Sequence, residues 1–367
     1  MPRGSLRANI LLAIGSTAAL AGAAEAVARL LGVAGAEVFS PEAVPQFDRE
    51  HFAGTRPPWF EPDPDLMWRW VPSRHTIEFR SDFQHWGYRT SSRGFRGDEV
   101  PWPPGRPLVL CAGNSVTAGY GVTDFDSFPS VLERTLRAKP GLEDARVINA
   151  GVYGYSSEQG RVQLGRLVPE LRPDVVVVEY GINDDAKSLY PDAMLIGRGG
   201  SLARVRRALN ASAAYRALRA PLVRAKLRAR AGDARREARV GPERYAENLR
   251  EIAAIVRAGG GRTIYVAPPS KWEWGIRSHS IYRKPRKVLN AYPMQLYRNV
   301  MGAVAFDEGS PFLLIPLLAG MEQGSAARFP DYCHPDAEGL CILAEGLAPL
   351  VIREIALGRP AVVRPAR

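Results

Sequence analysis

A carboxylate and an imidazole stand three residues apart near the carboxyl end of the sequence, at Asp331 and His334. One turn of backbone can hold both side chains together, and a histidine oriented by a carboxylate is a frequent general base in nucleophilic catalysis. A nucleophile for that base lies far upstream, where the apolar run 107–112 stops at residues 113–115 (GNS). This pattern predicts a strand that ends in a tight turn and presents the hydroxyl of Ser115.

Two further segments carry groups suited to acyl chemistry, and each follows an expected strand. They are residues 149–154 (NAGVYG) and 181–184 (GIND). Together with the serine segment and the Asp–His segment, they resemble, in order and spacing, the four blocks of the SGNH (GDSL-type) hydrolases, and the resemblance spans residues 106–352. A Gly-x-Ser motif alone is common in proteins, whereas four ordered blocks are a specific signal.

The resemblance implies a role for each chemically suited residue of the blocks. Ser115 would be the nucleophile, His334 the general base and Asp331 the residue that orients the base. The backbone N–H groups of Ser115 and Gly154 and the side-chain amide of Asn183 would form the oxyanion hole. Nothing in the sequence indicates a metal, nucleotide or flavin site, so we expect no cofactor.

Each of these residues also has a structural alternative when it is taken singly. Asn183 could cap a turn, Gly154 could serve backbone geometry, and His334 could be a surface histidine. The ordered arrangement of four blocks favours the catalytic interpretation. The sequence departs from the family's pattern at Asn114, where an aspartate usually precedes the serine. Since that position is outside the triad, we expect altered local hydrogen bonding and retained activity.

From residue 107 onward, apolar runs typical of strands alternate with amphipathic segments typical of helices. The run 175–178 (VVVV) is continuous and β-branched, as in strands that are buried on both faces of a parallel sheet. This alternation predicts an α/β fold with a doubly wound, flavodoxin-like sheet of five parallel strands, whose sites gather at the carboxyl ends of the strands. Ser156 and Gln159 are predicted to form a capping box that opens one helix. The expected strands are 107–112, 145–150, 174–180, 262–267 and 312–316, and the expected helices are 127–138, 157–170, 243–258 and 337–356.

Length and composition indicate one large globular domain with an appended piece, because 367 residues with 46% hydrophobic content suffice for a sizeable core. We expect a signal segment at 1–33, a small β-rich flap at 34–106, the catalytic domain at 107–358 and a short tail at 359–367. The flap is rich in proline and tryptophan. Its tryptophans could line a sugar-binding surface, but aromatic residues in a small lobe more often form its core, which we favour.

Residues 8–24 are largely apolar and uncharged, and they follow Arg3 and Arg7. This layout is typical of a signal peptide or a signal anchor. The run is slightly shorter than the ~20 residues of a transmembrane helix, and small residues at 21–26 offer cleavage sites. In either case we expect the catalytic domain outside the cytoplasm, tethered to the membrane or secreted. An ordinary buried helix is the alternative.

The formal net charge of +11 comes from one part of the sequence. Between residues 198 and 244 there are 14 Lys and Arg and 3 Asp and Glu, whereas the rest of the chain is neutral. The part from 198 to 240 also breaks the alternation and is interpreted as a basic helical insertion. It could lie on an anionic membrane surface or hold an acidic glycan, or it could be a solvated helical pair whose apolar stripe packs on the domain. Nucleic acid is not an expected partner of an exported chain.

The cysteines, at 111, 333 and 341, are odd in number and form no Cys-x-x-Cys motif. This count indicates neither a zinc site nor a disulfide framework. We expect all of them to be structural thiols.

The sequence leaves three functions open. The first is a serine esterase that removes a short acyl group, acetyl by preference, from an extracytoplasmic glycan or a similar small ester. The second is an O-acyltransferase that modifies a surface polysaccharide with the same triad and needs a separate acyl donor. The third is a carbohydrate-binding module without catalysis, which the intact triad disfavours.

Overall fold

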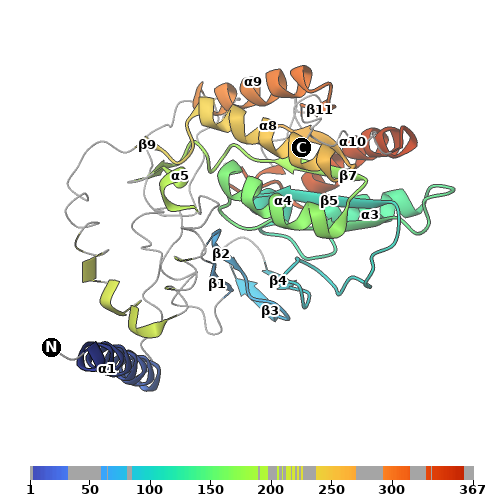
Figure 1. The fold of residues 1–367 in the computed structure, drawn as a ribbon. Coiled ribbons are helices and arrows are strands. Elements are labelled where there is room, and N and C mark those ends of the chain that lie inside the picture. Colours follow the sequence, from blue (N-terminus) through green and yellow to red (C-terminus); the bar gives the residue numbers. More distant parts are fainter. Residues whose placement is uncertain are drawn as a thin grey trace.

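We describe the protein from a computed structural model (Figure 1). The structure describes residues 3–31, 59–63, 65–80, 85–188, 191–196, 237–269, 292–314, 328–331 and 333–358, together with single residues and short stretches between 205 and 225. The expected tail at 359–367 and residues 34–58 of the expected flap lie outside these ranges.

Five parallel strands form the central sheet, in the spatial order β6, β5, β7, β10 and β11. Numbered along the chain within this sheet, the order is 2-1-3-4-5, which is the flavodoxin-like order of a doubly wound fold. The predicted fold class is therefore confirmed. The strands are β5 (Leu108–Gly113), β6 (Arg146–Asn149), β7 (Val175–Glu179), β10 (Arg262–Val266) and β11 (Phe312–Leu313).

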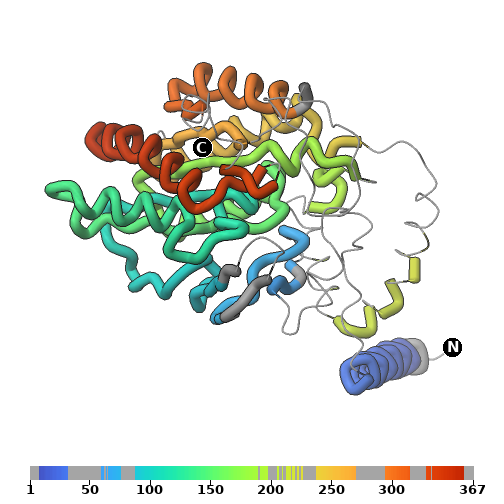
Figure 2. The backbone as a smooth tube through the Cα atoms, turned by 180° about the vertical axis from the view of Figure 1, so that it is seen from behind, coloured from blue at the N-terminus to red at the C-terminus, as the bar shows by residue number. Residues whose placement is uncertain are grey.

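Helices cover both faces of this sheet, and every residue of β5 and β7 is buried. One face packs against α4 (Ser157–Leu171), α8 (Pro242–Ala258) and α9 (Tyr292–Asp307), and the other packs against α3 (Phe128–Arg137) and α10 (Ala337–Ala356). Figures 1 and 2 show the sheet between these two helical layers. Because alternate side chains of a strand enter opposite cores, the run of four valines in β7 is explained by two buried faces.

The observed elements differ from the expected ones mainly toward the carboxyl end. The four expected helices are found as α3, α4, α8 and α10, but the expected strand 312–316 is shorter, since β11 ends at Leu313. Helix α9 is not predicted from the sequence. Its buried face includes Arg298, 2% exposed, which interrupts the apolar pattern. It also includes Gly302, where an added Cβ would come within 3.2 Å of the Phe312 ring.

Within its described residues, the flap contains two antiparallel strand pairs that lie beside the catalytic domain (Figure 1). Trp59, Trp68 and Trp70 are each at most 2% exposed, and their rings contact Tyr153 of the domain or its neighbours. The core interpretation is therefore confirmed for these three tryptophans, whereas Trp102 is 43% exposed. The strand pairs are β1 (Phe60–Asp63) with β2 (Met67–Trp70) and β3 (His75–Arg80) with β4 (His85–Arg89).

Helix α1 (Arg3–Leu30) projects from the rest of the chain, as the views in Figures 1 and 2 show. Its stretch Ala8–Leu30 has a mean hydropathy of 1.7 and is long and apolar enough to cross a membrane, by length and composition. A signal sequence has the same properties.

Most of the basic insertion at 198–240 lies outside the described residues. Its described stretches at 213–215 and 217–219 are helical, as expected. The carboxyl end of the insertion is not helical, because β9 (Glu237–Ala238) pairs antiparallel with β8 (Lys187–Ser188). The expectation of a wholly helical segment is therefore wrong at this end. The pairing satisfies backbone groups where the insertion returns to the domain.

Candidate active site

Ser115 lies at the carboxyl end of β5, as the first residue of the short helix α2 (Ser115–Ala118). The helix begins there because Asn114 caps it: the Asn114 Oδ1 accepts a hydrogen bond of 2.9 Å from the N–H of Val116. The first N–H groups of a helix have no partner within it. Within the described residues, the N–H of Ser115 has no acceptor and can therefore serve a ligand.

The structure brings Ser115, His334 and Asp331 together in a continuous chain of hydrogen bonds. The Oγ of Ser115 lies 2.7 Å from Nε2 of His334, and Nδ1 of the same ring lies 2.6 Å from Oδ2 of Asp331. The other carboxylate oxygen accepts from the backbone N–H groups of Cys333 at 2.9 Å and His334 at 2.8 Å. With Nδ1–H directed at the carboxylate, Nε2 is left to accept the proton of the serine hydroxyl.

The carboxyl group of Asp331 is held in its ionised form. Burial alone would raise its pKa, but the charge and hydrogen bond of His334 and the two backbone N–H groups outweigh burial, so the pKa of Asp331 lies below its ordinary value. An ionised carboxylate at Nδ1 fixes the tautomer of the ring and stabilises an imidazolium.

The ring of Tyr120 packs against the imidazole of His334, with centroids 4.4 Å apart and planes inclined by 37°. The N–H of Tyr120 donates to the carbonyl oxygen of Ser115 at 2.8 Å. The same ring meets Tyr153 edge to face at 5.3 Å. Tyr120 therefore links the base to the backbone of the nucleophile. Tyr120 could not be singled out from the sequence, because no spacing distinguishes it from other aromatic residues.

The other expected oxyanion donors follow β6 and β7. Gly154 has a positive φ of +76°, which glycine adopts without strain, and its N–H has no acceptor among the described residues. Asn183 is 6% exposed, and its Nδ2 donates to the carbonyl oxygen of Tyr155 at 3.0 Å. An amide carries two hydrogens, so one such bond leaves the second hydrogen for a ligand. With the N–H of Ser115, these donors stand at the carboxyl ends of three adjacent strands.

The loop after β6 lies directly against the nucleophile helix. At Gly151 an added Cβ would come within 2.4 Å of the backbone nitrogen of Ala118, so only glycine fits this contact. Beside it, the N–H of Val152 donates to the carbonyl oxygen of Gly113 at 3.1 Å. The contact therefore ties the loop that carries Gly154 to the turn that carries the nucleophile.

The flap tryptophans hold the other side of the same loop. The indole N–H of Trp68 donates to the carbonyl oxygen of Tyr153 at 2.9 Å, and that of Trp70 donates to Gly151 at 2.8 Å. The hydroxyl of Tyr155 donates in return to the carbonyl oxygen of Trp68 at 2.6 Å. These two tryptophans therefore position the backbone of the loop as well as forming the core of the flap.

A buried ion pair contacts the same loop. Arg239, 1% exposed, donates to both carboxylate oxygens of Asp192 in α5 (Asp192–Leu195), at 3.0 and 2.8 Å. Its guanidinium also donates to the carbonyl oxygen of Gly154 at 2.7 Å and to Oε1 of Gln159 at 2.8 Å. Arg239 could not be singled out from the sequence, because it is one of 14 cations in a basic segment and no local signal distinguishes it.

Asn114, which departs from the family's pattern, pairs with a buried carboxyl group. Its Nδ2 donates to Oε1 of Glu179 at 3.0 Å, and the hydroxyl of Thr117 donates to Oε2 at 3.1 Å. Burial raises the pKa of Glu179 to about 8. A neutral amide at position 114 avoids placing a second buried carboxyl beside Glu179, where two carboxylates would repel each other.

Asp331, Cys333 and His334 offer ligand atoms within 4.8 Å of one another, a spacing that a metal ion could use. Both ring nitrogens of His334 are already engaged, by Ser115 and Asp331. The thiol of Cys333 is 2% exposed, and its Sγ lies 3.6 Å from Nδ1. This donor set therefore fits a hydrogen-bonded triad better than a metal centre, which needs a free ring nitrogen. The three cysteines are all free thiols.

Known proteins share parts of this sequence. The chain is 34% identical over 103 residues to the esterase TesA of Pseudomonas aeruginosa, an alignment that covers 28% of this chain and 50% of that protein. It is 31% identical over 83 residues to the thioesterase 1/protease 1/lysophospholipase L1 of Escherichia coli, covering 23% and 38%. The chain thus spans half or less of the length of these curated relatives.

Solved structures and a family model also match. The crystal structure of TesA has a TM-score of 0.43 at 20% identity, covering 67% of this chain and 99% of that one. An acetylxylan esterase from Geobacillus stearothermophilus has a TM-score of 0.42 at 18% identity, covering 72% and 99%. The family model matches residues 111–340, which is more than half of the chain and includes both Ser115 and His334. On this match, the chain belongs to the GDSL-like lipase/acylhydrolase family.

Proposed function

We propose that the protein is a serine esterase that cleaves acyl esters with Ser115, His334 and Asp331. The observation that carries this proposal is the chain of hydrogen bonds, 2.7 and 2.6 Å long, that runs from the serine through the imidazole to the carboxylate. Family membership supports it. The relatives named as an esterase and a thioesterase also share one chemistry, attack on an acyl carbonyl.

In the first half of the reaction, the Oγ of Ser115 attacks the carbonyl carbon of the ester while its proton passes to Nε2 of His334. Asp331 stabilises the imidazolium that forms. Negative charge develops on the carbonyl oxygen, where the N–H groups of Ser115 and Gly154 and the amide of Asn183 can meet it. Removal of one such donor typically costs roughly 10²–10³ in rate.

The intermediate collapses when the imidazolium gives its proton to the leaving oxygen, which departs as an alcohol and leaves the acyl group on Ser115. A water molecule then attacks the acyl carbon while Nε2 of His334 takes one of its protons. The same proton returns to the Oγ of Ser115 as the carboxylic acid leaves. Ester and water are the reactants, and alcohol and acid are the products.

The substrate that we propose is a short-chain acyl ester, acetyl first, of a glycan outside the cytoplasm. Helix α1 supports this location, because Arg3 and Arg7 precede an apolar stretch of 23 residues and basic residues stay on the cytoplasmic side. The helix then acts as an anchor, or it is a signal sequence that is removed. In an O-acyltransferase the acyl group would end on an acceptor hydroxyl instead of water, and product analysis with an acetylated glycan separates the two reactions.

The test measures hydrolysis of p-nitrophenyl acetate by the full-length protein in detergent. We expect Ser115→Ala and His334→Ala to lose nearly all activity while their circular dichroism spectra stay unchanged. Ser310→Ala is a matched control, because this half-buried serine precedes β11 at the amino end of the sheet, opposite Ser115. Undiminished turnover in Ser115→Ala overturns the proposed chemistry. The proposed substrate class is tested separately with p-nitrophenyl esters of increasing acyl chain length. A preference for long chains would overturn the proposed acetyl specificity and leave the proposed catalytic residues unaffected.

A further inference from the structure

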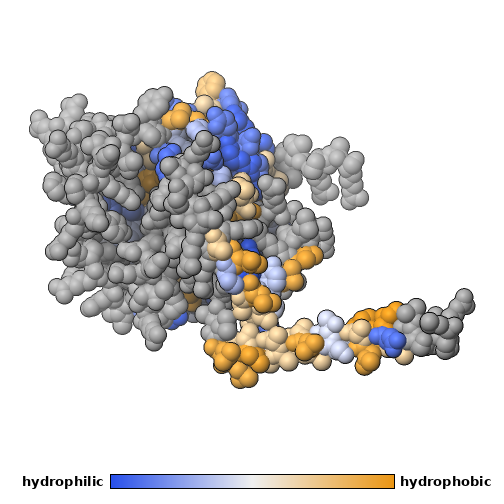
Figure 3. Space-filling model, turned by 90° about the vertical axis from the view of Figure 1, so that its left-hand side faces the viewer, coloured by the Kyte–Doolittle hydropathy of each residue, from blue (hydrophilic) through white to orange (hydrophobic). Residues whose placement is uncertain are grey.

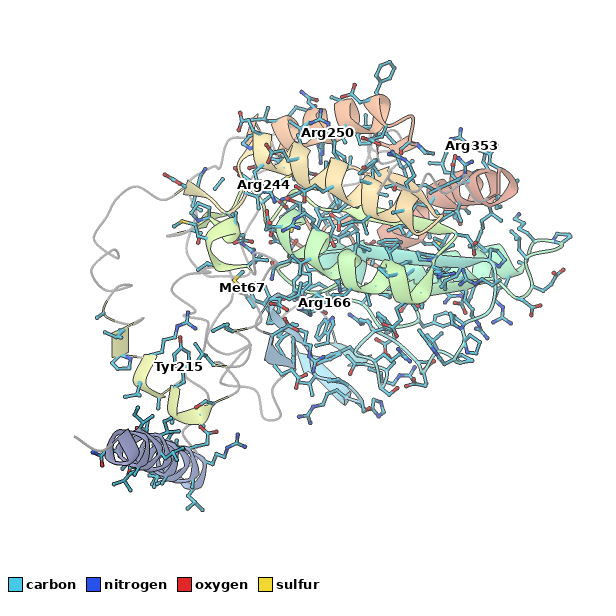
Figure 4. All side chains as sticks on the ribbon, in the orientation of Figure 1. Met67, Arg166, Tyr215, Arg244, Arg250 and Arg353 are labelled. Carbon is cyan, nitrogen blue, oxygen red and sulfur yellow. The ribbon has the colours of Figure 1, made fainter. Side chains whose placement is uncertain are left out.

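Helix α1 and the basic insertion meet at one carboxylate, that of Glu25. Its Oε1 accepts from the N–H of Ala213 at 3.0 Å, and its Oε2 accepts from the N–H of Ala214 at 3.0 Å and from the hydroxyl of Ser212 at 2.7 Å. These donors lie at the start of the helical stretch that begins at Ala213. The carboxylate of Glu25, on α1, therefore accepts hydrogen bonds from the first N–H groups of that stretch, as an N-cap side chain does. Figure 4 shows Tyr215, in that stretch, next to α1.

The position of Glu25 on α1 fits the boundary of a membrane. The 17 residues at 8–24 carry no charge, and at 1.5 Å per residue they span about 25 Å, close to the ~30 Å hydrocarbon core of a bilayer. Glu25 is the first charged residue after them, and it pairs with Arg29 at 2.7 Å. If α1 spans a membrane, the hydrogen bonds to Glu25 therefore place the first turn of the helical stretch at Ala213 at the level of the headgroups.

Four large apolar side chains among the described residues of the insertion are exposed. Leu218 and Leu222 are 74% and 67% exposed, and Val205 and Leu209 are 54% and 43% exposed. Both pairs have the four-residue spacing that puts side chains on one face of a helix. These four side chains therefore do not pack on the described part of the catalytic domain. Figure 3 shows apolar side chains gathered on this part of the surface, beside the projecting apolar helix.

The charge of the insertion complements an anionic surface. Of the 14 Lys and Arg at 198–244, 12 lie at 198–236, where Asp233 is the single acidic residue. Exposed apolar side chains within a strongly basic segment are typical of helices that lie in the headgroup layer of an anionic membrane.

We propose that the basic insertion is a membrane-binding segment that rests on anionic lipid headgroups and is clipped to the anchor helix by Glu25. The side chains of Leu218 and Leu222 enter the boundary between headgroups and acyl chains, and the positive charge of residues 198–236 attracts the segment to anionic lipid. Two attachments then restrict the height and tilt of the catalytic domain above the bilayer. This proposal is independent of the chemistry at Ser115.

The first test places nitroxide labels on the full-length protein in liposomes of phosphatidylglycerol and phosphatidylcholine. Leu218→Cys and Leu222→Cys are labelled in a Cys341→Ser background, because the other two cysteines are buried. Electron paramagnetic resonance then compares relaxation by oxygen, which concentrates in lipid, with relaxation by a water-soluble nickel chelate. We expect oxygen to dominate at both positions. The matched control is Phe306→Cys on α9, an apolar residue that is 87% exposed, where nickel should dominate.

Two results would overturn the membrane contact. Nickel-dominated relaxation at 218 and 222 would mean that the insertion is a solvated helical face. Equal oxygen-dominated values in liposomes of phosphatidylcholine alone would mean that the anionic headgroups and the basic residues play no part.

The second test removes the clip. Glu25→Ala deletes the acceptor of three hydrogen bonds, so we expect the label at 218 to become several times more accessible to nickel in the same liposomes. Hydrolysis of p-nitrophenyl acetate in detergent should stay unchanged, which also shows that the catalytic body is folded. Ser16→Ala is the matched control on α1, since the hydroxyl of Ser16 donates to Leu12 of its own helix. Wild-type accessibility at 218 in Glu25→Ala would overturn the clip.

Discussion

Arg239 donates a hydrogen bond of 2.7 Å to the carbonyl oxygen of Gly154, whose own N–H is a proposed oxyanion donor. The position of Arg239 is fixed on two sides. Its N–H donates to the carbonyl oxygen of Ala186 at 2.9 Å, and its guanidinium is paired with the buried carboxylate of Asp192. The end of the basic insertion therefore reaches the loop after β6, which carries Gly154, through the buried side chain of Arg239.

We expect Arg239→Lys to lower kcat while KM changes little. Lysine keeps the positive charge beside Asp192, but an ammonium group cannot replace the planar fork that bonds Asp192, Gly154 and Gln159 together. A displacement of about 1 Å in a catalytic group can cost roughly 100-fold in rate, so we expect a loss of roughly 10- to 100-fold in kcat. Steady-state kinetics on a soluble ester measure it. Arg244→Lys is the matched control, because Arg244 pairs with Glu158, outside the loop. Wild-type kcat in Arg239→Lys would show that the loop keeps its geometry without the guanidinium.

Asp331→Asn should fold and lose on the order of 10³- to 10⁴-fold in kcat. The amide of asparagine donates to Nδ1 of His334, which favours the tautomer that carries its proton on Nε2. That nitrogen then cannot accept the proton of Ser115. Single-turnover kinetics would measure the loss in the acylation step, and acylation at the wild-type rate would contradict the orienting role of Asp331.

The rate on a neutral ester should fall as the solution is acidified, with a slope of one proton. A protonated His334 cannot accept the proton of Ser115. Asp331 does not contribute this limb, because its pKa lies below its ordinary value and its carboxyl group is held ionised. A pH-stat assay gives the profile, and a rate that stays constant on acidification would argue against a histidine base.

Local sequence patterns were sufficient to predict the elements whose structure depends on their own residues alone. The capping box at Ser156 is present as predicted, and β7 is the buried strand that its valines indicate. Helix α9 and Arg239 required knowledge of distant partners. Arg298 is buried in α9 because it donates twice to the carbonyl oxygen of Pro268, at 2.9 and 2.7 Å. Arg239 is buried because Asp192, 47 positions away, faces it, and neither local sequence contains that pairing.

The candidate site shows the same division. Ser115, Gly154 and Asn183 follow β5, β6 and β7, and the carboxyl ends of adjacent parallel strands meet in any sheet of this order. Their gathering could therefore be predicted from strand ends. The stacking of Tyr120 on His334 could not, because it depends on how the segment before α10 approaches the nucleophile turn.

We expect the buried carboxyl group of Glu179 to lower the free energy of unfolding as the pH rises. Burial raises its pKa from an ordinary value of 4.5 to about 8, so between these values the native state keeps a proton that the unfolded chain releases. The free energy of unfolding therefore decreases through this window, by up to about 1.4 kcal/mol per pH unit. Below the lower value both states are protonated, and this group adds no pH dependence. Urea unfolding at several pH values measures the slope.

Glu179→Gln isolates this contribution, because an amide does not ionise. We expect the variant to differ least from the wild type at acid pH and to become the more stable protein as the pH rises. Glu170→Gln is the control, since that side chain is 49% exposed on α4. Parallel stability curves for the wild type and Glu179→Gln would show that Glu179 does not titrate in this window.

Gly151→Ala should slow catalysis through the nucleophile helix. The added Cβ would come within 2.4 Å of the backbone nitrogen of Ala118 and 2.9 Å of its Cα, and backbone cannot move aside as the end of a side chain can. Helix α2 must shift, and Ser115 is its first residue. We expect kcat to fall by about 10-fold or more, and overpacking to lower the free energy of unfolding by about 1–3 kcal/mol. Ester hydrolysis and urea unfolding measure the two effects.

Gly165→Ala on α4 separates this steric effect from the effect of adding a methyl group. Its nearest neighbour is the Cδ1 of Ile255 at 4.0 Å, an ordinary contact. Alanine favours a helix over glycine by about 0.5–1 kcal/mol, so we expect this variant to be slightly more stable and to keep the wild-type kcat. If Gly151→Ala also kept the wild-type kcat, α2 and the loop after β6 could separate without moving Ser115. The nucleophile would then be positioned by the turn at the end of β5 alone.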